Sequence, residues 1–328
     1  MSLFLRGIFL FVFVLTACRL QKPIKYDPKE LGIEDNCQPS KATYFYDSLL
    51  TPKYLQTEVA DSNTIKRFSL RARNISISIG AMHSLNRFTL LEPLAHQGSD
   101  SAKLALLFVR QEIDERLSLA LLDVSTVQAE IDCEKERAMQ LRNYLTQMTN
   151  KRVKILNIGS IVVGAVGTLI SSAISLNDPA ANIPIQEASI LGAVAGGYLA
   201  LRQIFIRRSA FFAHPRNHLR EIWENPSRPI AFPPNVWHFM TKEFPLDGRN
   251  LSRRQLLLNE FREIRILGKD STDRQERIKL FFGDGGEYNV EHLSNRINML
   301  ELLETEINLM KYDLKRLHQE VLLSNIER

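Results

Sequence analysis

Apolar residues recur alternately three and four positions apart over two long stretches, Ile113–Met148 and Leu300–Val321. This spacing puts them on one stripe of a helix, as in coiled coils. In the first stripe, Glu134 is the one polar position. Proline and glycine are missing from Ser101–Asn157, so this helix should run on into the apolar segment that follows, over about 110 Å. We predict an all-α fold in which a C-terminal helix, Asn289 to about Ser324, packs back on a coiled-coil stem. Self-association of that helix is the alternative.

A long uncharged pattern follows the stem over residues 155–206. Ile155–Leu176 holds 22 residues without a charge, which as a helix reach about 33 Å, against a hydrocarbon core about 30 Å thick. After a polar turn with two prolines, Ala188–Leu201 adds 14 uncharged residues, or about 21 Å. The pattern predicts a helical hairpin whose first arm is long enough to cross a bilayer. The second arm crosses only if Glu187 and Arg202 reach opposite interfaces.

Small residues mark the expected interface between the two arms. Glycine inside a water-exposed helix costs about 1 kcal/mol relative to alanine, whereas in a dry setting it lets helix backbones approach closely. Two settings remain open, a bilayer and the interior of a soluble bundle or oligomer. The interface positions are Gly159, Gly164, Gly167, Gly192, Gly196 and Gly197.

The N-terminus has the pattern of an export signal. Arg6 precedes the short apolar core Gly7–Val14, and Leu15-Thr16-Ala17-Cys18 follows. These four residues resemble the lipobox of bacterial lipoproteins, which implies cleavage after Ala17 and acylation of Cys18. An ordinary signal peptide or a first transmembrane helix is the alternative. Two or three acyl chains would form a durable membrane anchor, since a single chain binds only marginally.

The lipoprotein resemblance also implies a location. In Gram-negative lipoproteins an aspartate after the acylated cysteine retains the protein in the inner membrane, whereas Arg19 follows Cys18 here. An outer-membrane lipoprotein facing the periplasm is therefore expected. In that oxidising compartment Cys37 and Cys133 can form a disulfide, with two free buried thiols as the alternative.

The chain is expected to contain six segments. They are the signal peptide 1–17, an acylated tether 18–62, an N-terminal helix and coiled-coil stem 63–154, the hairpin 155–206, a connector rich in proline and aromatic residues 207–250, and a C-terminal helical region with a coiled coil 251–328.

Local signals refine three of these segments. The N-terminal helix should run from about Ile65 to Pro93 or Gly98, although Asn74–Gly80 also alternates as a strand would. The connector is expected to lie over a hydrophobic surface and fill it, with a partner-binding role as the alternative. In the last segment we expect helices over Leu256–Leu267 and up to Phe282, followed by a turn over residues 283–286.

The sequence lacks the patterns of common catalytic sites. It contains no HExxH, GxSxG, Walker or dinucleotide-binding motif. His214 and His218 are four residues apart but lack a third metal ligand in register. The acidic residues 130, 132, 134 and 136 point in successive directions around a helix and are interleaved with Lys135 and Arg137. We expect no enzyme activity, no cofactor and no metal.

Charge and helix pattern narrow the expected partners. The net charge is +5, from 42 basic and 37 acidic residues interleaved along the chain, and this mixture argues against nucleic-acid binding. Membrane lipid is expected at the hairpin. A second copy or another envelope protein is expected at the coiled coils.

Together these patterns favour a non-enzymatic, lipid-anchored structural or scaffold protein of the cell envelope. The hairpin loosely resembles that of the glycine-zipper lipoproteins of the bacterial outer membrane, which implies a structural role with the hairpin in or against lipid. Two alternatives remain open. One is a membrane-active module similar to helical pore-forming toxins, and the other is a soluble periplasmic scaffold with the hairpin buried in an oligomer.

Overall fold

The fold is known from a computed structural model that describes residues 24–26, 59–177, 193–203, 208–246, 249–268 and 270–323. The chain divides into two compact units. The hairpin unit comprises Met1–Ile33, Met139–Phe212 and Glu287–Ser294. The stem unit comprises Glu34–Ala138, Ala213–Gly286 and Asn295–Arg328.

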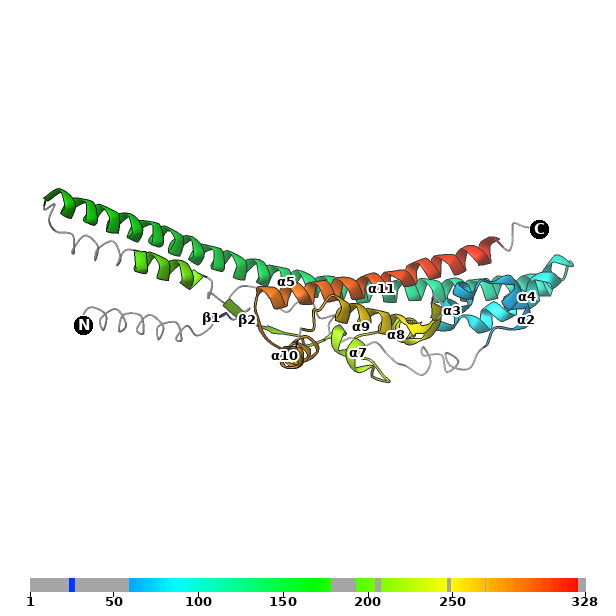
Figure 1. The fold of residues 1–328 in the computed structure, drawn as a ribbon. Coiled ribbons are helices and arrows are strands. Elements are labelled where there is room, and N and C mark those ends of the chain that lie inside the picture. Colours follow the sequence, from blue (N-terminus) through cyan, green and yellow to red (C-terminus); the bar gives the residue numbers. More distant parts are fainter. Residues whose placement is uncertain are drawn as a thin grey trace. The chain divides into compact units, whose positions relative to one another are not determined.

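The prediction of an all-α protein is confirmed, with short strands added (Figure 1). The helices are α2 (Ser62–Arg67), α3 (Leu70–Ser78), α4 (Met82–His96), α5 (Asp100–Asn177), α7 (His218–Glu224), α8 (Pro234–Thr241), α9 (Arg253–Glu263), α10 (Ser271–Phe282) and α11 (Val290–Leu323). The strands are β1 (Ile24–Tyr26), β2 (Arg208–Ala213), β3 (Glu243–Leu246), β4 (Arg249–Ser252) and β5 (Gly285–Tyr288).

Helix α5 runs without interruption for 78 residues, as the sequence predicted. At its start the Ser99 hydroxyl accepts a hydrogen bond from the backbone N–H of Ala102. At the helical rise its length is about 117 Å. Residues of both compact units therefore belong to this one helix.

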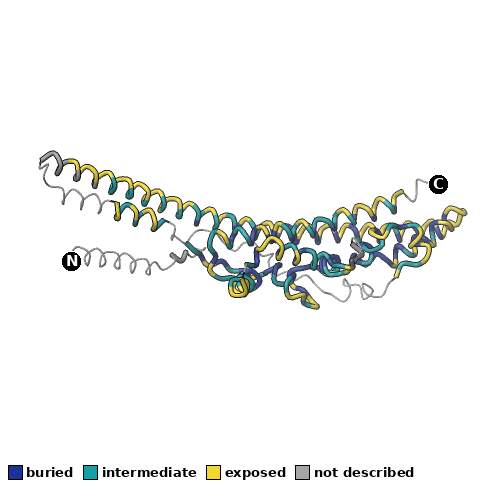
Figure 2. Tube along the Cα trace, in the orientation of Figure 1, coloured by how far each residue is buried: buried dark blue, intermediate teal, exposed yellow. Residues whose placement is uncertain are grey.

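The stem unit is built on the two predicted apolar stripes. Within it, α11 packs along α5, and the stripe residues of both helices are at most 5% exposed (Figures 1 and 2). Ion pairing between Lys135 and Glu304 and a hydrogen bond from Lys311 to Gln128 join the helices beside this core. The buried stripe positions are Ile113, Leu117, Ala120, Val124, Val127, Ile131, Leu300, Leu303, Ile307, Met310, Leu314, Leu317 and Val321.

The single N-terminal helix expected from Ile65 is instead three short helices, α2, α3 and α4. Phe68, after α2, has extended φ and ψ, and Gly80, after α3, has φ +69°, so the chain turns at both residues. The strand alternative for Asn74–Gly80 is wrong, since α3 covers most of that segment. Periodicity alone could not separate one helix from three, because each short helix buries the same stripe.

Pro93 does not end α4, which continues to His96 before Gly98 takes φ +95°. The buried carboxylate of Glu92 forms an ion pair with Arg67 and so ties α4 to α2. At the start of α2, the Asp61 carboxylate accepts from the backbone N–H of Thr64. Asp61 is therefore the N-cap of α2.

The connector fills hydrophobic surface, as expected. Phe232, Val236, Trp237, Phe239 and Met240 are all buried in the stem unit, and the ring of Phe232 packs against that of Trp237 in α8. The sequence did not predict strands here, yet β3 and β4 form an antiparallel pair with Phe244 opposite Leu251.

The C-terminal helices follow the predicted order. α9 starts with a capping box between Ser252 and Gln255, and α10 ends at Phe282. Of the segment expected as a turn, residues 283–286, only the first two form a bend, and the last two already belong to β5. Because a turn and a short strand share the same glycine-rich composition, the sequence could not distinguish them.

The hairpin unit contains the distal part of α5 and a second helical segment, residues 193–203. It also contains β1, which pairs in parallel with β2 and places Tyr26 opposite Ala210. Thus part of the expected tether is a strand. Tyr288 of β5 packs edge-on against Phe212 of β2, with ring centroids 5.8 Å apart. Among the described residues, the structure contains no helix with both the length and the apolarity needed to cross a membrane.

Candidate functional site

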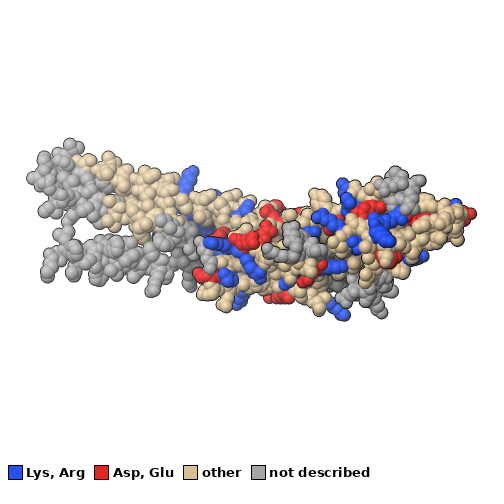
Figure 3. All heavy atoms as spheres, turned by 45° about the vertical axis from the view of Figure 1, so that its right-hand side comes forward, with Lys and Arg blue, Asp and Glu red and all other residues tan. Residues whose placement is uncertain are grey.

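The hairpin exposes large apolar side chains along the distal part of α5. Ile161 is 70% exposed and Leu169 is 68% exposed. Figure 2 shows this part of α5 as mainly exposed or half-buried, and Figure 3 shows the same surface without acidic or basic residues beyond its base. Other apolar residues on this surface are Ile155, Ile158, Val162 and Val166. Contiguous exposed apolar surface of this kind is typical of interaction sites.

The two arms touch at small residues. A Cβ added to Gly196 would lie 3.5 Å from the carbonyl oxygen of Ser160, and one added to Gly159 would lie 3.8 Å from Leu199 Cδ1. These glycines lie where the helices approach each other.

The remaining predicted interface glycines differ. A Cβ added to Gly164 or Gly197 would meet no atom within 4 Å, and Gly197 is exposed. At these two positions the described structure therefore leaves room for a side chain. The surroundings of Gly167, and Gly192 itself, lie outside the described part of the chain.

Basic residues lie at the base of the apolar arm. Lys151, Arg152 and Lys154 are exposed on α5, one turn before the uncharged surface begins. Arg202 is half-buried near the end of the second arm. Long basic side chains in such places can reach lipid headgroups while their stems cover apolar surface.

The predicted modification sites are only partly within the described chain. Cys133 is disulfide-bonded. Cys18 and Cys37 lie outside the described residues, so the pairing of Cys37 with Cys133 and the acylation of Cys18 stay predictions.

A second feature, absent from the sequence-based expectations, is a buried polar network in the stem unit. Its centre is Glu134, the polar position of the α5 stripe, which forms an ion pair with Arg296 of α11. His214 Nδ1 lies 3.3 Å from Glu134 Oε1. Arg296 is fully buried, and the other two side chains are nearly so. A buried charge requires such a partner, because leaving it unpaired costs several kcal/mol.

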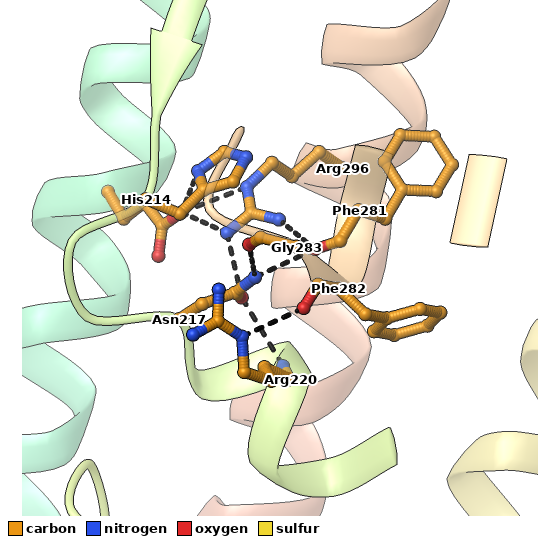
Figure 4. Close-up of polar contacts among 8 residues, drawn as sticks. His214, Asn217, Arg220, Phe281, Phe282, Gly283 and Arg296 are labelled. Atoms are coloured by element: carbon orange, nitrogen blue, oxygen red, sulfur yellow. Dashed lines mark hydrogen bonds and ion pairs between the residues drawn. The ribbon is translucent and has the colours of Figure 1, made fainter. Parts of the chain in front are cut away.

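The network also orders the chain that surrounds it (Figure 4). Arg296 Nη1 donates to the carbonyl oxygen of Phe281 at 2.7 Å. Asn217 Nδ2 donates to the carbonyls of Phe281 and Gly283, each at 2.9 Å, and Arg220 Nε donates to that of Phe282 at 3.0 Å. These bonds satisfy the carbonyls at the end of α10, where helix geometry provides no partner.

A second set of charges lies one turn earlier on α5. Glu130 Oε2 is 3.2 Å from Arg216 Nε and 3.3 Å from His218 Nε2. Glu130 and Glu134 are four residues apart, so they share one face of α5 and meet the loop between β2 and α7 together. That loop is therefore held to α5 by two carboxylates.

The protonation of the network follows from its burial. Desolvation alone would raise the pKa of Glu134, but Arg296 and His214 outweigh it and hold that pKa well below its usual range. Desolvation and the Arg296 charge lower the pKa of His214 to about 4, despite the opposing effect of Glu134. At neutral pH the network thus consists of a carboxylate, a guanidinium and a neutral imidazole.

The network has the chemistry of a structural element. Paired Glu and His side chains can exchange protons, but these are closed to solvent, so a substrate cannot reach them in this conformation. His214 and His218, the residues weighed above as a metal pair, each contact a different carboxylate. Within the described ranges no group of three or more His, Cys, Asp or Glu could hold a metal ion.

The network could have been inferred from one signal in the sequence. Glu134 interrupts the first stripe, and Arg296 occupies the position four residues before Leu300, where the second stripe would continue. Two opposite charges on facing stripes indicate a buried ion pair. The contributions of His214 and Asn217 had no such signal, because they come from a loop.

Comparison of the chain with models of known protein families, with curated proteins and with solved structures finds no match.

Proposed function

We propose that this chain is a non-enzymatic, lipid-anchored structural protein of the bacterial cell envelope whose helical hairpin contacts membrane lipid. Acylated Cys18 would provide the anchor, in the outer membrane and on its periplasmic face. The stem unit would be the body that contacts other envelope components.

One observation carries the proposal. Beyond Lys154 the described part of the first arm is uncharged, and its large apolar side chains face outward. Burying one Val, Leu or Ile side chain is worth roughly 1.5–3 kcal/mol. Several such side chains on one helix therefore favour an apolar environment strongly. The basic residues at the base of the arm suit the anionic headgroup region that borders such an environment.

Fractionation of cells that express the wild-type chain, Cys18→Ala, and Cys18→Ala with Ile161→Lys and Leu169→Lys tests the proposal. We expect mass spectrometry to find acylated Cys18 in the wild type. The single variant should stay in membranes after carbonate or urea extraction, because the hairpin still binds lipid. The triple variant should be released, because lysines at exposed apolar positions oppose lipid contact.

A matched control places the same two lysines elsewhere. Leu322→Lys with Leu323→Lys changes exposed leucines at the end of α11 and should leave the Cys18→Ala variant in the membrane. Full release of the Cys18→Ala variant would instead favour a soluble scaffold. Unmodified Cys18 in cells would refute the lipid anchor, and leakage of liposomes treated with the protein would favour a pore-forming module.

A further inference from the structure

The stem unit carries a second apolar stripe on α5, on the side opposite the core. Leu104, Phe108 and Leu122 are 57%, 63% and 66% exposed, and Leu107 and Leu119 are also exposed. A shallow depression along this side is lined by residues of α5 alone. We call this surface, residues 104–122, the outer face of α5. Contiguous exposed apolar residues on a helix indicate an interaction surface.

The spacing of the outer face is that of a coiled-coil seam. Its central positions follow one another at intervals of four, three, four, three and four residues. They are Leu104, Phe108, Gln111, Glu115, Ser118 and Leu122. Core residues such as Ile113 and Leu117 occupy the opposite side, so this helix has two seams. The inner seam holds α11, and the side chains of the outer seam are exposed in the described part of the chain.

We infer that the outer face of α5 binds the same face of a second copy of this chain, antiparallel and with its two-fold axis near Ile113. The intervals read the same in both directions about that residue. An antiparallel partner then places Leu104 against Leu122 of the second copy and Gln111 against Glu115 of the second copy. A two-fold interface requires this kind of self-complementarity.

The polar centre of the seam fits this arrangement. Gln111 Nε2 donates to Glu115 Oε1 within one chain at 2.9 Å. In the antiparallel pair the second amide hydrogen of Gln111 can donate to Glu115 of the second copy, so two such bonds form about the axis. A polar pair at the centre of an apolar seam fixes its register and orientation.

The flanking charges fit as well. On one side of the seam, Arg110 comes near Asp114 of the second copy. Position 110 lies level with position 116 of the second copy, and Asp114 is two residues away from that position. On the other side, Glu112 comes near Arg116 of the second copy in the same way. Opposite charges therefore face each other on both flanks. A parallel pair would instead put Glu115 against Glu115 of the second copy at the centre of the seam.

The seam is short, which sets the expected strength of the dimer. Nineteen residues of helix cover about 28 Å, and a single helix pair of that length lies at the low end of specific interfaces, below about 1,200 Å² in total. The dimer should therefore depend on protein concentration. Confinement to a surface would favour it by raising the effective concentration.

Cross-linking of the full chain tests the geometry. Leu104→Cys and Leu122→Cys chains with different tags are expressed together and treated with a short bismaleimide. We expect a cross-link between the two variants and none between copies of either variant alone, because an antiparallel pair separates equal positions by 18 residues, about 27 Å. A cross-link within Leu104→Cys alone would overturn the antiparallel arrangement.

Light scattering of the full chain in mild detergent tests the surface itself. Leu104→Glu with Leu122→Glu should raise the dimer dissociation constant at least tenfold, because both leucine–leucine contacts across the two-fold, four side chains in all, are lost. Leu90→Glu with Leu94→Glu, a matched pair of exposed leucines on α4, should not change it. A monomer at all concentrations, or a dimer unaffected by the α5 variant, would refute the inference. Loss of vesicle binding in the α5 variant, with a monomeric wild type, would assign the face to lipid instead.

Discussion

At the scale of single residues, Glu134 and Arg296 decide how the stem unit is organised. Each lies in the apolar stripe of its helix, Glu134 in α5 and Arg296 in α11, and each is buried. Such a pair contributes little net stability relative to apolar residues of the same size, but either charge alone in the core is costly. The pair therefore acts mainly by specifying register, because any slip between α5 and α11 would separate the two charges.

Removal of one partner should destabilise the stem unit strongly. We expect Arg296→Met to lower the free energy of unfolding by about 3–5 kcal/mol, since it leaves Glu134 charged and buried. Glu134→Met with Arg296→Met should cost less than the sum of the single variants, because the two side chains are coupled. Urea denaturation followed by circular dichroism measures both. Lys103→Met, which breaks the exposed pair with Asp100, serves as the control and should have no measurable effect.

Strictly additive losses in the double variant would contradict a coupled pair. They would indicate that the bonds from Arg296 to Asn217 and to the Phe281 carbonyl account for its stabilising effect instead.

The buried histidines predict a loss of stability in acid. His214 has a pKa near 4 in the folded chain, from burial and the nearby Arg296 and Arg137, whereas the unfolded value is about 6.5. Burial next to Lys242 lowers the pKa of His238 to about 4 as well. Between pH 6.5 and 4 the unfolded chain therefore binds protons that the folded chain does not. Stability contributed by these groups is present above pH 6.5 and is lost as the pH falls toward 4.

The size of this effect can be bounded for His214. The fall in the pKa of His214 from 6.5 to about 4 corresponds to at most about 3.4 kcal/mol. We expect the urea midpoint to fall steadily from pH 7 to pH 5, and His214→Gln to reduce the slope. A midpoint that does not change over this range would show that the His214 ring gains a proton without cost in the folded chain.

At the scale of elements, the glycines of the helices and turns have different roles. Glycine weakens a helix because it lacks a side chain and has a flexible backbone. Its retention is required only where a Cβ has no room. The structure separates these cases within this chain.

Gly164→Ala should be tolerated, and should stabilise the first arm by up to about 1 kcal/mol, because a Cβ there meets nothing within 4 Å. Gly283→Ala should destabilise the stem unit, because a Cβ there collides with the carbonyl oxygen of Lys279. Thermal unfolding of the two variants side by side checks both expectations. An equal loss of stability would show that Gly164 is held in a close contact after all.

At the scale of the whole molecule, the chain forms two compact units that differ in their surfaces. The stem unit has a complete core with a buried polar network, whereas the hairpin unit presents apolar side chains outward. A disulfide at Cys133 adds covalent restraint to the stem helix. If Cys37 is its partner, as the sequence predicts, the bridge closes a long loop within the stem unit and restricts its unfolded state.

The sequence by itself determined the elements whose pattern is local and repeated. The uninterrupted α5, the C-terminal helix and their apolar stripes follow from periodicity, because a helix places every third or fourth residue on one side whatever surrounds it. The helix caps at Ser99 and Ser252 likewise depend on chemistry within four residues. The long uncharged segment also follows directly from composition.

Only the tertiary structure decided which residues meet across the chain. The pairing of β1 with β2, the break of the N-terminal helix into three, and the approach of His214 and Asn217 to Glu134 depend on contacts between distant segments. Local sequence cannot specify such contacts, because polar residues of the same kind also occur on solvated helix faces. Their burial, and with it their pKa and energetic role, is set by what packs against them.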